Sequence, residues 1–286
     1  MPARVRKAVI PAAGLGTRCL PLTKAVPKEL LPIYDRPALE IIADEAADSG
    51  VDTLVLVTGR GKTAIEDHFD RHPHLESRLG GKADLVEAIS RQTDRCEIVA
   101  VRQGEALGLG HAVGRAAAAV GDEPFAVMLP DDLVFGDQPA LRALIAAYER
   151  TGQGAVLLME VPDDEVSRYG IVAGSRNADG TVRIDDLVEK PLRNQAPTNL
   201  AIVGRYVFPP RIFAHIAATR PGALGEIQLT DAMRALTRES GLVGVMIEGL
   251  RLDTGSPLGL LWAGLHYASS RDPAAREMIR QFVARG

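Results

Sequence analysis

The chain lacks most of the features that would place it among disulfide-rich, zinc-binding, secreted or membrane proteins. Its 286 residues include two cysteines, Cys19 and Cys96, which are too few for a disulfide framework and belong to no CxxC or CxxH pair. No uninterrupted apolar stretch of about 18 residues is present, and the short apolar run near the N-terminus is not a secretory h-region. We therefore expect no membrane partner and a reducing, cytoplasmic location.

An excess of positive charge is also missing. The chain has 33 lysines and arginines against 37 aspartates and glutamates, for a formal net charge of -4. General nucleic-acid binders carry a basic surplus, so we expect no nucleic-acid partner. Any phosphate would have to bind at a focused site.

What the chain does have is an alternation of short β-rich runs with segments of helical period. We expect strands at 5–10, 53–57, 97–101 and 125–129, with helical segments between them at 37–50, 61–70, 85–90 and 110–121. This βαβ alternation predicts an α/β fold with a Rossmann-like mixed, mostly parallel sheet flanked by helices. Ligands of such sheets bind beyond the carboxyl ends of the strands.

The pattern changes at about residue 169. Close-spaced strand candidates at 169–174, 181–191 and 199–208 predict a smaller antiparallel sub-region laid on the parallel core. Helical patterns return at 226–240 and from 256 to the end. No repeat, low-complexity tract or linker separates the halves, which favours one domain.

A glycine loop directly follows the first strand, in "VIPAAGLGTRCLPLTKAVPKELLP". Gly14 and Gly16 are followed by Cys19, at the position where both a dinucleotide-binding fingerprint and a Walker A loop require glycine. That difference argues against a Rossmann NAD(P) oxidoreductase. Glycines allow backbone N–H groups to approach a nucleotide, and Arg18 and Lys28 could neutralise a triphosphate, so we favour a nucleotide site over a tight turn with surface cations.

Taken together with later segments, this loop resembles the UTP–glucose-1-phosphate uridylyltransferases, a group of bacterial sugar-1-phosphate nucleotidyltransferases. The likeness runs from residue 7 to about residue 262 and includes "GLGTRCLPLTKAVPKELLP", "VRQGEALGLGHAV", "LPDDLVF", "RYGIV", "LVEKP", "AIVGRYVF" and "GEIQLTDAM". The resemblance implies the nucleotide-diphospho-sugar transferase fold and conversion of UTP and glucose 1-phosphate into UDP-glucose and pyrophosphate. It further implies Mg²⁺ as cofactor and a homodimer or homotetramer.

Under this resemblance the whole chain, 1–286, is a single nucleotidyltransferase domain. We expect a nucleotide-binding core at about 1–160, a sugar-phosphate-binding part at about 161–255 and C-terminal helices at about 256–286. A sugar phosphate is already an ionised nucleophile, so the reaction needs no general base. Positioning and charge stabilisation of an in-line attack on the α-phosphate can supply the catalysis.

The resemblance implies a catalytic role for Arg18, Lys28, Asp131 and Lys190. Asp131 follows an apolar strand, where a carboxylate can hold a divalent cation beside a phosphate, although an isolated acidic pair is more often a turn or a helix cap. Related enzymes complete the metal site with an aspartate before glycine, which here is Asp253. Arg18 and Lys28 would hold the triphosphate, and Lys190 would orient the attacking phosphate.

The resemblance also supplies a set of substrate-binding candidates. Gln103 and Gly108 would recognise uracil, and Glu189 and Glu226 would bind sugar hydroxyls. Neighbours on a strand point to opposite faces, so Glu189 and Lys190 could reach one ligand only through a twist or bulge. The full set is Ala12, Ala13, Gly14, Gly16, Glu29, Gln103, Gly108, Asp132, Gly170, Glu189 and Glu226.

Some features stay open at this level. His111 is interpreted as a packed or capping histidine, and Asp132 as a possible support for the loop alone. Pro257 stands where the glucose enzymes commonly have a lysine, which puts the sugar in doubt. A glucose-1-phosphate thymidylyltransferase using dTTP is the nearest alternative, because uracil and thymine differ by one methyl group. A non-catalytic nucleotide-binding module is a further alternative.

Overall fold

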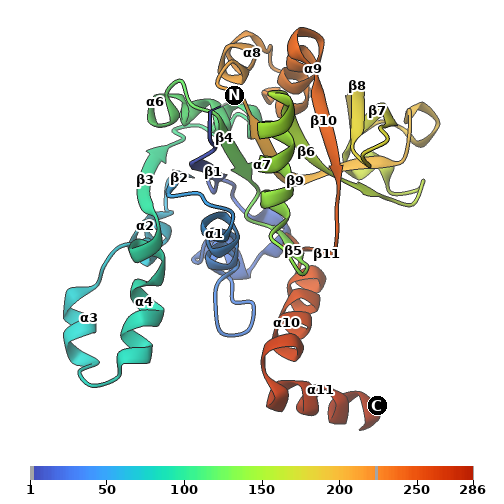
Figure 1. Ribbon diagram of the computed structural model, residues 1–286. Helices are drawn as coiled ribbons and strands as arrows, with labels where there is room; N and C mark the ends of the chain where they lie inside the picture. The colour runs from blue at the N-terminus through green and yellow to red at the C-terminus, as the bar shows by residue number, and fades with distance from the viewer. Residues whose placement is uncertain (1–2, 223–224, 286) are drawn as a thin grey trace.

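The computed structural model describes residues 3–222 and 225–285, which form one large mixed sheet, a small second sheet and surrounding helices (Figure 1). The large sheet has nine strands in the order β3-β2-β1-β4-β9-β6-β10-β8-β7. Its strands are β1 (Lys7–Pro11), β2 (Thr53–Thr58), β3 (Glu97–Arg102), β4 (Phe125–Met128), β6 (Gly154–Glu160), β7 (Gly170–Arg176), β8 (Val182–Glu189), β9 (Leu200–Phe208) and β10 (Leu242–Met246). The second sheet pairs β5 (Asp132–Phe135) with β11 (Leu250–Asp253).

Helices connect and cover these strands. Their bounds are α1 (Ala38–Asp48), α2 (Thr63–Phe69), α3 (Pro73–Arg78), α4 (Ala83–Arg95), α5 (Leu109–Arg115), α6 (Ala117–Val120), α7 (Ala140–Thr151), α8 (Ile212–Ala218), α9 (Leu229–Ser240), α10 (Pro257–Arg271) and α11 (Pro273–Arg285). None of the helices within the described ranges is long and apolar enough to cross a membrane.

The four strands expected in the first half are present and parallel. β1 pairs with β2 and β4, and β2 pairs with β3. All four residues of β4 are buried, because helices cover both faces of the sheet at this point. The predicted α/β fold is confirmed.

The position of β9 differs from the expectation of a strand laid on the parallel core. β9 lies inside the large sheet, antiparallel to both β4 and β6. Its nine residues are all buried, including Arg205, whose guanidinium pairs with Glu45 of α1 at 2.6 Å. β7 and β8 form the expected antiparallel edge, and β7 also pairs with β9 through Ile171 and Ala201.

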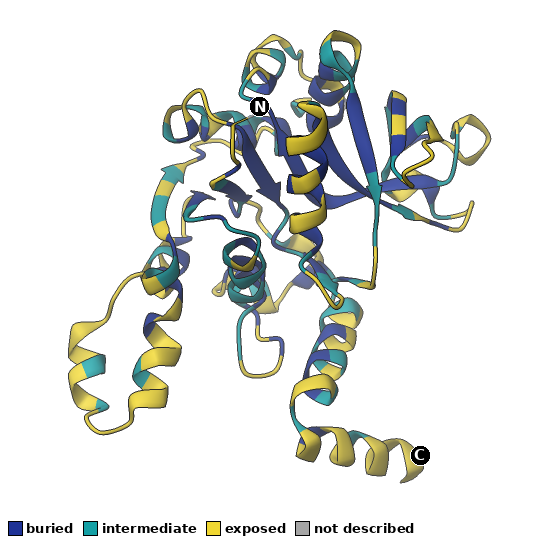
Figure 2. Cartoon of the chain, in the orientation of Figure 1, coloured by how far each residue is buried: buried dark blue, intermediate teal, exposed yellow. Residues whose placement is uncertain are grey.

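The sheet forms the middle of three layers. One hydrophobic cluster packs α1 and α7 against the sheet, and a second packs α5, α8 and α9 against the other face. The buried residues accordingly concentrate on the central strands (Figure 2). Helices α10 and α11 extend away from this body, as does the α3–α4 arm (Figure 1). The division at about residues 160 and 255 stays a prediction.

Candidate functional site

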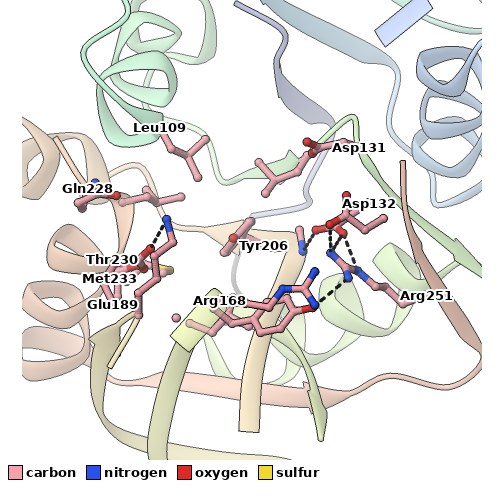
Figure 3. A pocket seen from close by; sticks show the side chains of 18 of the residues that line it. Leu109, Asp131, Asp132, Arg168, Glu189, Tyr206, Gln228, Thr230, Met233 and Arg251 are labelled. Atoms are coloured by element: carbon pink, nitrogen blue, oxygen red, sulfur yellow. Dashed lines mark hydrogen bonds and ion pairs between the residues drawn. The ribbon is translucent and has the colours of Figure 1, made fainter. Parts of the chain in front are cut away.

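A cavity of about 590 Å³ lies beyond the carboxyl end of β4. Figure 3 shows Asp131, Asp132 and Arg251 on one side and Glu189, Gln228 and Thr230 on the other, with Tyr206 between them. The lining includes seven of the sequence-predicted residues: Arg18, Asp131, Asp132, Gly170, Glu189, Lys190 and Asp253. The structure therefore brings together candidates from distant parts of the chain.

Two cations of the glycine loop converge on Asp131. The Lys28 Nζ lies 2.6 Å from the Asp131 Oδ2, and an Arg18 Nη2 lies 3.6 Å from the same oxygen. Burial alone would raise the pKa of Asp131, but Lys28 and Arg18 outweigh it and hold that pKa below its usual value. Burial would likewise lower the pKa of Lys28, yet Asp131 raises it. Both groups are charged at neutral pH.

Asp131 and Asp253 form a candidate metal centre. The Arg18 guanidinium lies between them, because its Nη1 is 3.9 Å from the Asp253 Oδ2. No cluster of three or more histidine, cysteine or acidic ligands occurs in the described part of the chain. Mg²⁺ is commonly held by one or two carboxylates and completes its shell with water and substrate phosphates. Asp131 and Asp253 supply two such carboxylates, and both lie within 3.9 Å of the Arg18 guanidinium.

Both carboxylate oxygens of Asp132 accept hydrogen bonds from other residues of the protein. One carboxylate oxygen accepts the Gly204 backbone N–H at 3.0 Å, and the other accepts from the Arg251 Nε at 2.6 Å. Arg251 also approaches Asp253 at 3.7 Å and the Tyr169 hydroxyl at 3.3 Å. Burial raises the pKa of Asp132, and the Arg251 guanidinium opposes that rise. Asp132 lines the cavity, and these contacts agree with its interpretation as a support for the loop.

The opposite side of the cavity is built around Glu189 and Lys190. β8 ends at Glu189, and Lys190 has a positive φ of 44°, which supplies the change of direction that a regular strand would not. Both side chains line the cavity, and their charged atoms are 3.7 Å apart. The Thr230 hydroxyl donates to the Glu189 Oε2 at 2.5 Å. At Gly170 a Cβ would lie 3.2 Å from that same oxygen, so glycine leaves the carboxylate room.

The glycine loop lies at the carboxyl end of β1, where its Arg18 reaches the cavity lining and its alanines and glycines lie beside the lining. The Ala12 N–H donates to the Val57 carbonyl at 2.8 Å, and Ala13 packs against Gly59. Gly16 has a φ of 67°. Gly14 and Gly16 both lie close to the Lys28 side chain, so the loop folds over the lysine that contacts Asp131. This explains how a strand-end loop places the Lys28 ammonium against Asp131 of the cavity lining.

Gln103, Gly108 and Glu226 form a separate corner, outside the cavity lining. Gln103 is buried and its Nε2 donates to the Gly108 carbonyl at 3.3 Å. Glu226 packs beside Gly108 and accepts from the Gln228 Nε2 at 3.0 Å. Helix α9 begins at Leu229, so Glu226 precedes the helix and is not at its start as expected.

Glu29 is fully buried, away from the cavity. Its Oε2 pairs with the Lys62 Nζ at 2.7 Å, while its Oε1 has no hydrogen-bond partner among the described residues. Burial raises the pKa of Glu29, opposed by the Lys62 charge.

Sequence reasoning missed several lining residues, and short motifs could have indicated most of them. Gln228 and Thr230 lie within "GEIQLTD", Arg168 begins "RYGIV", and Arg251 precedes Asp253 in "LRLD".

The start of α10 accounts for the proline at position 257. Ser256 caps α10 by accepting the Gly259 N–H at 3.2 Å, and Pro257 occupies the first helical position, where a missing N–H costs nothing.

Comparisons with known proteins point in one direction. Residues 7–270 match the family described as nucleotidyl transferase. A UTP–glucose-1-phosphate uridylyltransferase 2 from Staphylococcus saprophyticus is 45% identical over 282 residues, covering 98% of this chain and 97% of that protein.

Solved structures with a similar fold include enzymes of the same group. A UDP-glucose pyrophosphorylase complexed with UDP-glucose has a TM-score of 0.86 at 39% identity, covering 93% of this chain and 100% of that chain. A UTP-bound UGPase from Acinetobacter baumannii has a TM-score of 0.89 at 39% identity, covering 98% and 99%. A putative glucose-1-phosphate thymidylyltransferase from Bacillus anthracis is only 22% identical with a TM-score of 0.72, covering 94% and 96%, so it shares the fold alone.

Proposed function

Because the chain belongs to the nucleotidyl transferase family, we propose that it is a UTP–glucose-1-phosphate uridylyltransferase. It converts UTP and glucose 1-phosphate into UDP-glucose and pyrophosphate. The observation that carries this conclusion is the near full-length likeness to enzymes of that name. The convergence of Lys28 and Arg18 on Asp131 supports it, because a reaction between two anions needs concentrated positive charge.

The mechanism follows from the charges in the cavity. Lys28 and Arg18 would bind the triphosphate and stabilise the departing pyrophosphate, and Lys190 would orient the attacking phosphate oxygen of the sugar. Glu189, held by Thr230, would accept hydrogen bonds from sugar hydroxyls. No side chain has to remove a proton, because the attacking oxygen is already ionised at neutral pH. The side chains bring the two substrates into line and neutralise their charge.

The metal assignment forms part of this proposal. Asp131 and Asp253 would hold Mg²⁺, which supplies positive charge beside the reacting phosphates when bound. Because Lys28 and Arg18 both contact Asp131, and Arg18 also approaches Asp253, their side chains would be displaced from the carboxylates towards the triphosphate. In such an exchange Mg²⁺ would replace the two cationic side chains as the partner of Asp131, and the triphosphate would replace Asp131 as the partner of Lys28 and Arg18.

The remaining binding contacts are proposed for the base end of UTP and for the sugar of glucose 1-phosphate. Gln103 and Gly108 would read the uracil edge, with the alanines and glycines of the loop at Ala12, Ala13, Gly14 and Gly16 against the nucleoside. Glu29 would contribute its free Oε1. At the sugar end, Glu226, which lies beside Gly108, would contact the glucose. The missing side chain of Gly170 would leave space for that glucose beside Glu189.

We also propose a cytoplasmic homodimer or homotetramer. Cys19 and Cys96 are both free and buried, which is consistent with a reducing compartment. Helix α10 exposes apolar side chains at helical spacing, namely Leu258, Leu261, Trp262 and Leu265. A second copy of the chain is the partner we assign to this stripe.

The direct test is pyrophosphate release from UTP, dTTP, CTP, ATP and GTP, each with glucose 1-phosphate and then galactose 1-phosphate. We expect strong release with UTP and glucose 1-phosphate, abolished by EDTA and restored by Mg²⁺. Asp131→Asn should lose most of this activity, whereas Asp137→Asn, an exposed acid in the turn after β5, should keep it. Preference for dTTP, or silence across the panel, would contradict the proposal.

A further inference from the structure

Gln103 and His111 meet where β3 ends and α5 begins. Gln103 follows β3 directly, and its backbone N–H donates to the Thr58 carbonyl at 2.8 Å. Its side chain is almost fully buried. His111, the third residue of α5, lies with its Nδ1 3.0 Å from the Gln103 Nε2. No side chain of the described residues caps the start of α5 by a hydrogen bond, so His111 is not the capping residue considered from the sequence.

The Gly108 carbonyl determines which way the Gln103 amide faces. A carbonyl oxygen can only accept, so the amide atom 3.3 Å from it must be the nitrogen. That nitrogen carries two hydrogens, and the second one is directed at His111. The Nδ1 of His111 must then be the unprotonated acceptor, with the ring hydrogen on Nε2.

The Gly108 acceptor is held in place by packing. Gly108 has a φ of 99°, and a Cβ there would lie 2.8 Å from the Ile227 carbonyl oxygen. The segment before α9 is tied to the same turn, because the Ile227 N–H donates to the Leu107 carbonyl at 2.8 Å and its own carbonyl accepts the Gly110 N–H at 2.9 Å. The Gln103 amide nitrogen therefore has one preorganised partner in Gly108 and a second partner in His111 on α5.

We propose that His111 is a positioning residue for nucleobase choice, an inference that rests on the proposed use of UTP. With the amide nitrogen occupied by His111 and Gly108, the Gln103 Oε1 is left as an acceptor, and no hydrogen bond to it is found within residues 3–222 and 225–285. Uracil presents an N3–H donor, whereas cytosine presents an N3 acceptor. An Oε1 that faces the N3 position of the base accepts from uracil and repels cytosine.

The role of His111 predicts what its loss would do. With His111 gone, only the bond to the Gly108 carbonyl would hold the Gln103 amide, so a half-turn that presents its nitrogen to the base would cost less than in the wild type. Cytosine would then be tolerated. The effect should therefore fall on the ratio of UTP to CTP use, and not on turnover in general.

The test compares His111→Leu with His111→Asn in the full chain. Asparagine keeps an acceptor oxygen near the position of the histidine Nδ1, and leucine removes it. We expect His111→Leu to lower the ratio of kcat/KM for UTP to that for CTP roughly tenfold, and His111→Asn to stay within about threefold of wild type. In a Gln103→Leu background, His111→Leu should leave the ratio unchanged.

Several results would overturn the inference. An equal loss for UTP and CTP in His111→Leu would mean that His111 only supports the fold. If His111→Leu does not reach the wild-type Tm, His111→Phe and the ¹⁵N shifts of His111 in the wild-type chain decide the matter, and a hydrogen on Nδ1 would contradict it. Absence of wild-type turnover with every nucleoside triphosphate would instead refute the proposed function, while the tautomer measurement would still test the hydrogen bond.

Discussion

At the scale of single residues, Lys190 provides the sharpest test of the sugar-phosphate site. Its ammonium lies at the cavity, more than half exposed, and the only acid that it approaches among the described residues is Glu189. Lys190→Ala should lower kcat/KM for glucose 1-phosphate by about 10- to 100-fold, because a charged hydrogen bond contributes roughly 1.5–3 kcal/mol. The KM for UTP should change little in steady-state kinetics.

Arg193→Ala is the matched control for that substitution. Arg193 is also exposed, and the one acid that it approaches in the described part of the chain is Asp163, at 3.9 Å. Its removal should leave turnover with glucose 1-phosphate near wild type. Unchanged kinetics in Lys190→Ala would show that the attacking phosphate is oriented by another group.

The charge state of Lys28 and Asp131 makes a prediction about pH. The lowered pKa of Asp131 means that its stabilising contribution is present above its unfolded value of about 3.9 and is lost only in stronger acid. The raised pKa of Lys28 means that its contribution is present below about 10.4 and is lost only as pH rises through the folded value. Neither group titrates between about pH 5 and 9.

The substrate phosphate should therefore control the profile. We expect kcat/KM for glucose 1-phosphate to rise through an apparent pKa of about 6, the second ionisation of a phosphate monoester, and then to stay flat to about pH 9. A pH-rate series at saturating UTP and Mg²⁺ checks this. A second apparent pKa between 7 and 9 would indicate a general acid or base that the proposed mechanism does not contain.

At the scale of elements, the β5–β11 pair positions the two aspartates proposed to hold metal. Asp132 lies opposite Asp253 in this pair, and Arg251 of β11 neutralises Asp132 in a largely buried contact. Arg251→Met would leave that carboxylate without its cation, which should lower the free energy of unfolding by about 3–5 kcal/mol. Urea unfolding measures the loss.

Two further variants separate charge from packing in that pair. Arg251→Met combined with Asp132→Asn should recover part of the stability, because no unpaired buried charge remains. Arg183→Met removes an exposed pair with Asp185 on β8 and should cost less than about 1 kcal/mol. Equal losses for the Arg251 and Arg183 variants would mean that the β5–β11 contact is no stronger than a surface ion pair.

The same elements show how far the sequence could lead. β1 to β4 were predictable because each is an apolar run bounded by turn residues, and the loop after β1 placed Arg18 and Lys28 at the site. β5 and β11 have four residues each, and their pairing depends on tertiary contacts. Likewise, Lys190 was predicted to need an irregular backbone, but its positive φ is visible only in the structure.

At the scale of the whole molecule, the exposed stripe on α10 is the feature that a monomer leaves unexplained. Leu258, Leu261, Trp262 and Leu265 follow the i, i+3, i+4, i+7 spacing of a buried helix face, yet all four are exposed. Met278, Phe282 and Val283 of α11 are exposed as well. These helices project from the body (Figure 1), so a second copy could cover them without blocking the cavity.

Trp262→Glu places a charge in the middle of that stripe and should shift the protein to the monomer. Burying an unpaired carboxylate in an apolar interface costs several kcal/mol, which is at least about 100-fold in the dissociation constant. Light scattering coupled to size-exclusion chromatography measures the change in mass. Ser270→Glu adds the same charge to an exposed position of α10 outside the stripe and should keep the wild-type mass. A monomeric wild type, or an unchanged mass in Trp262→Glu, would mean that another surface or another partner covers these helices.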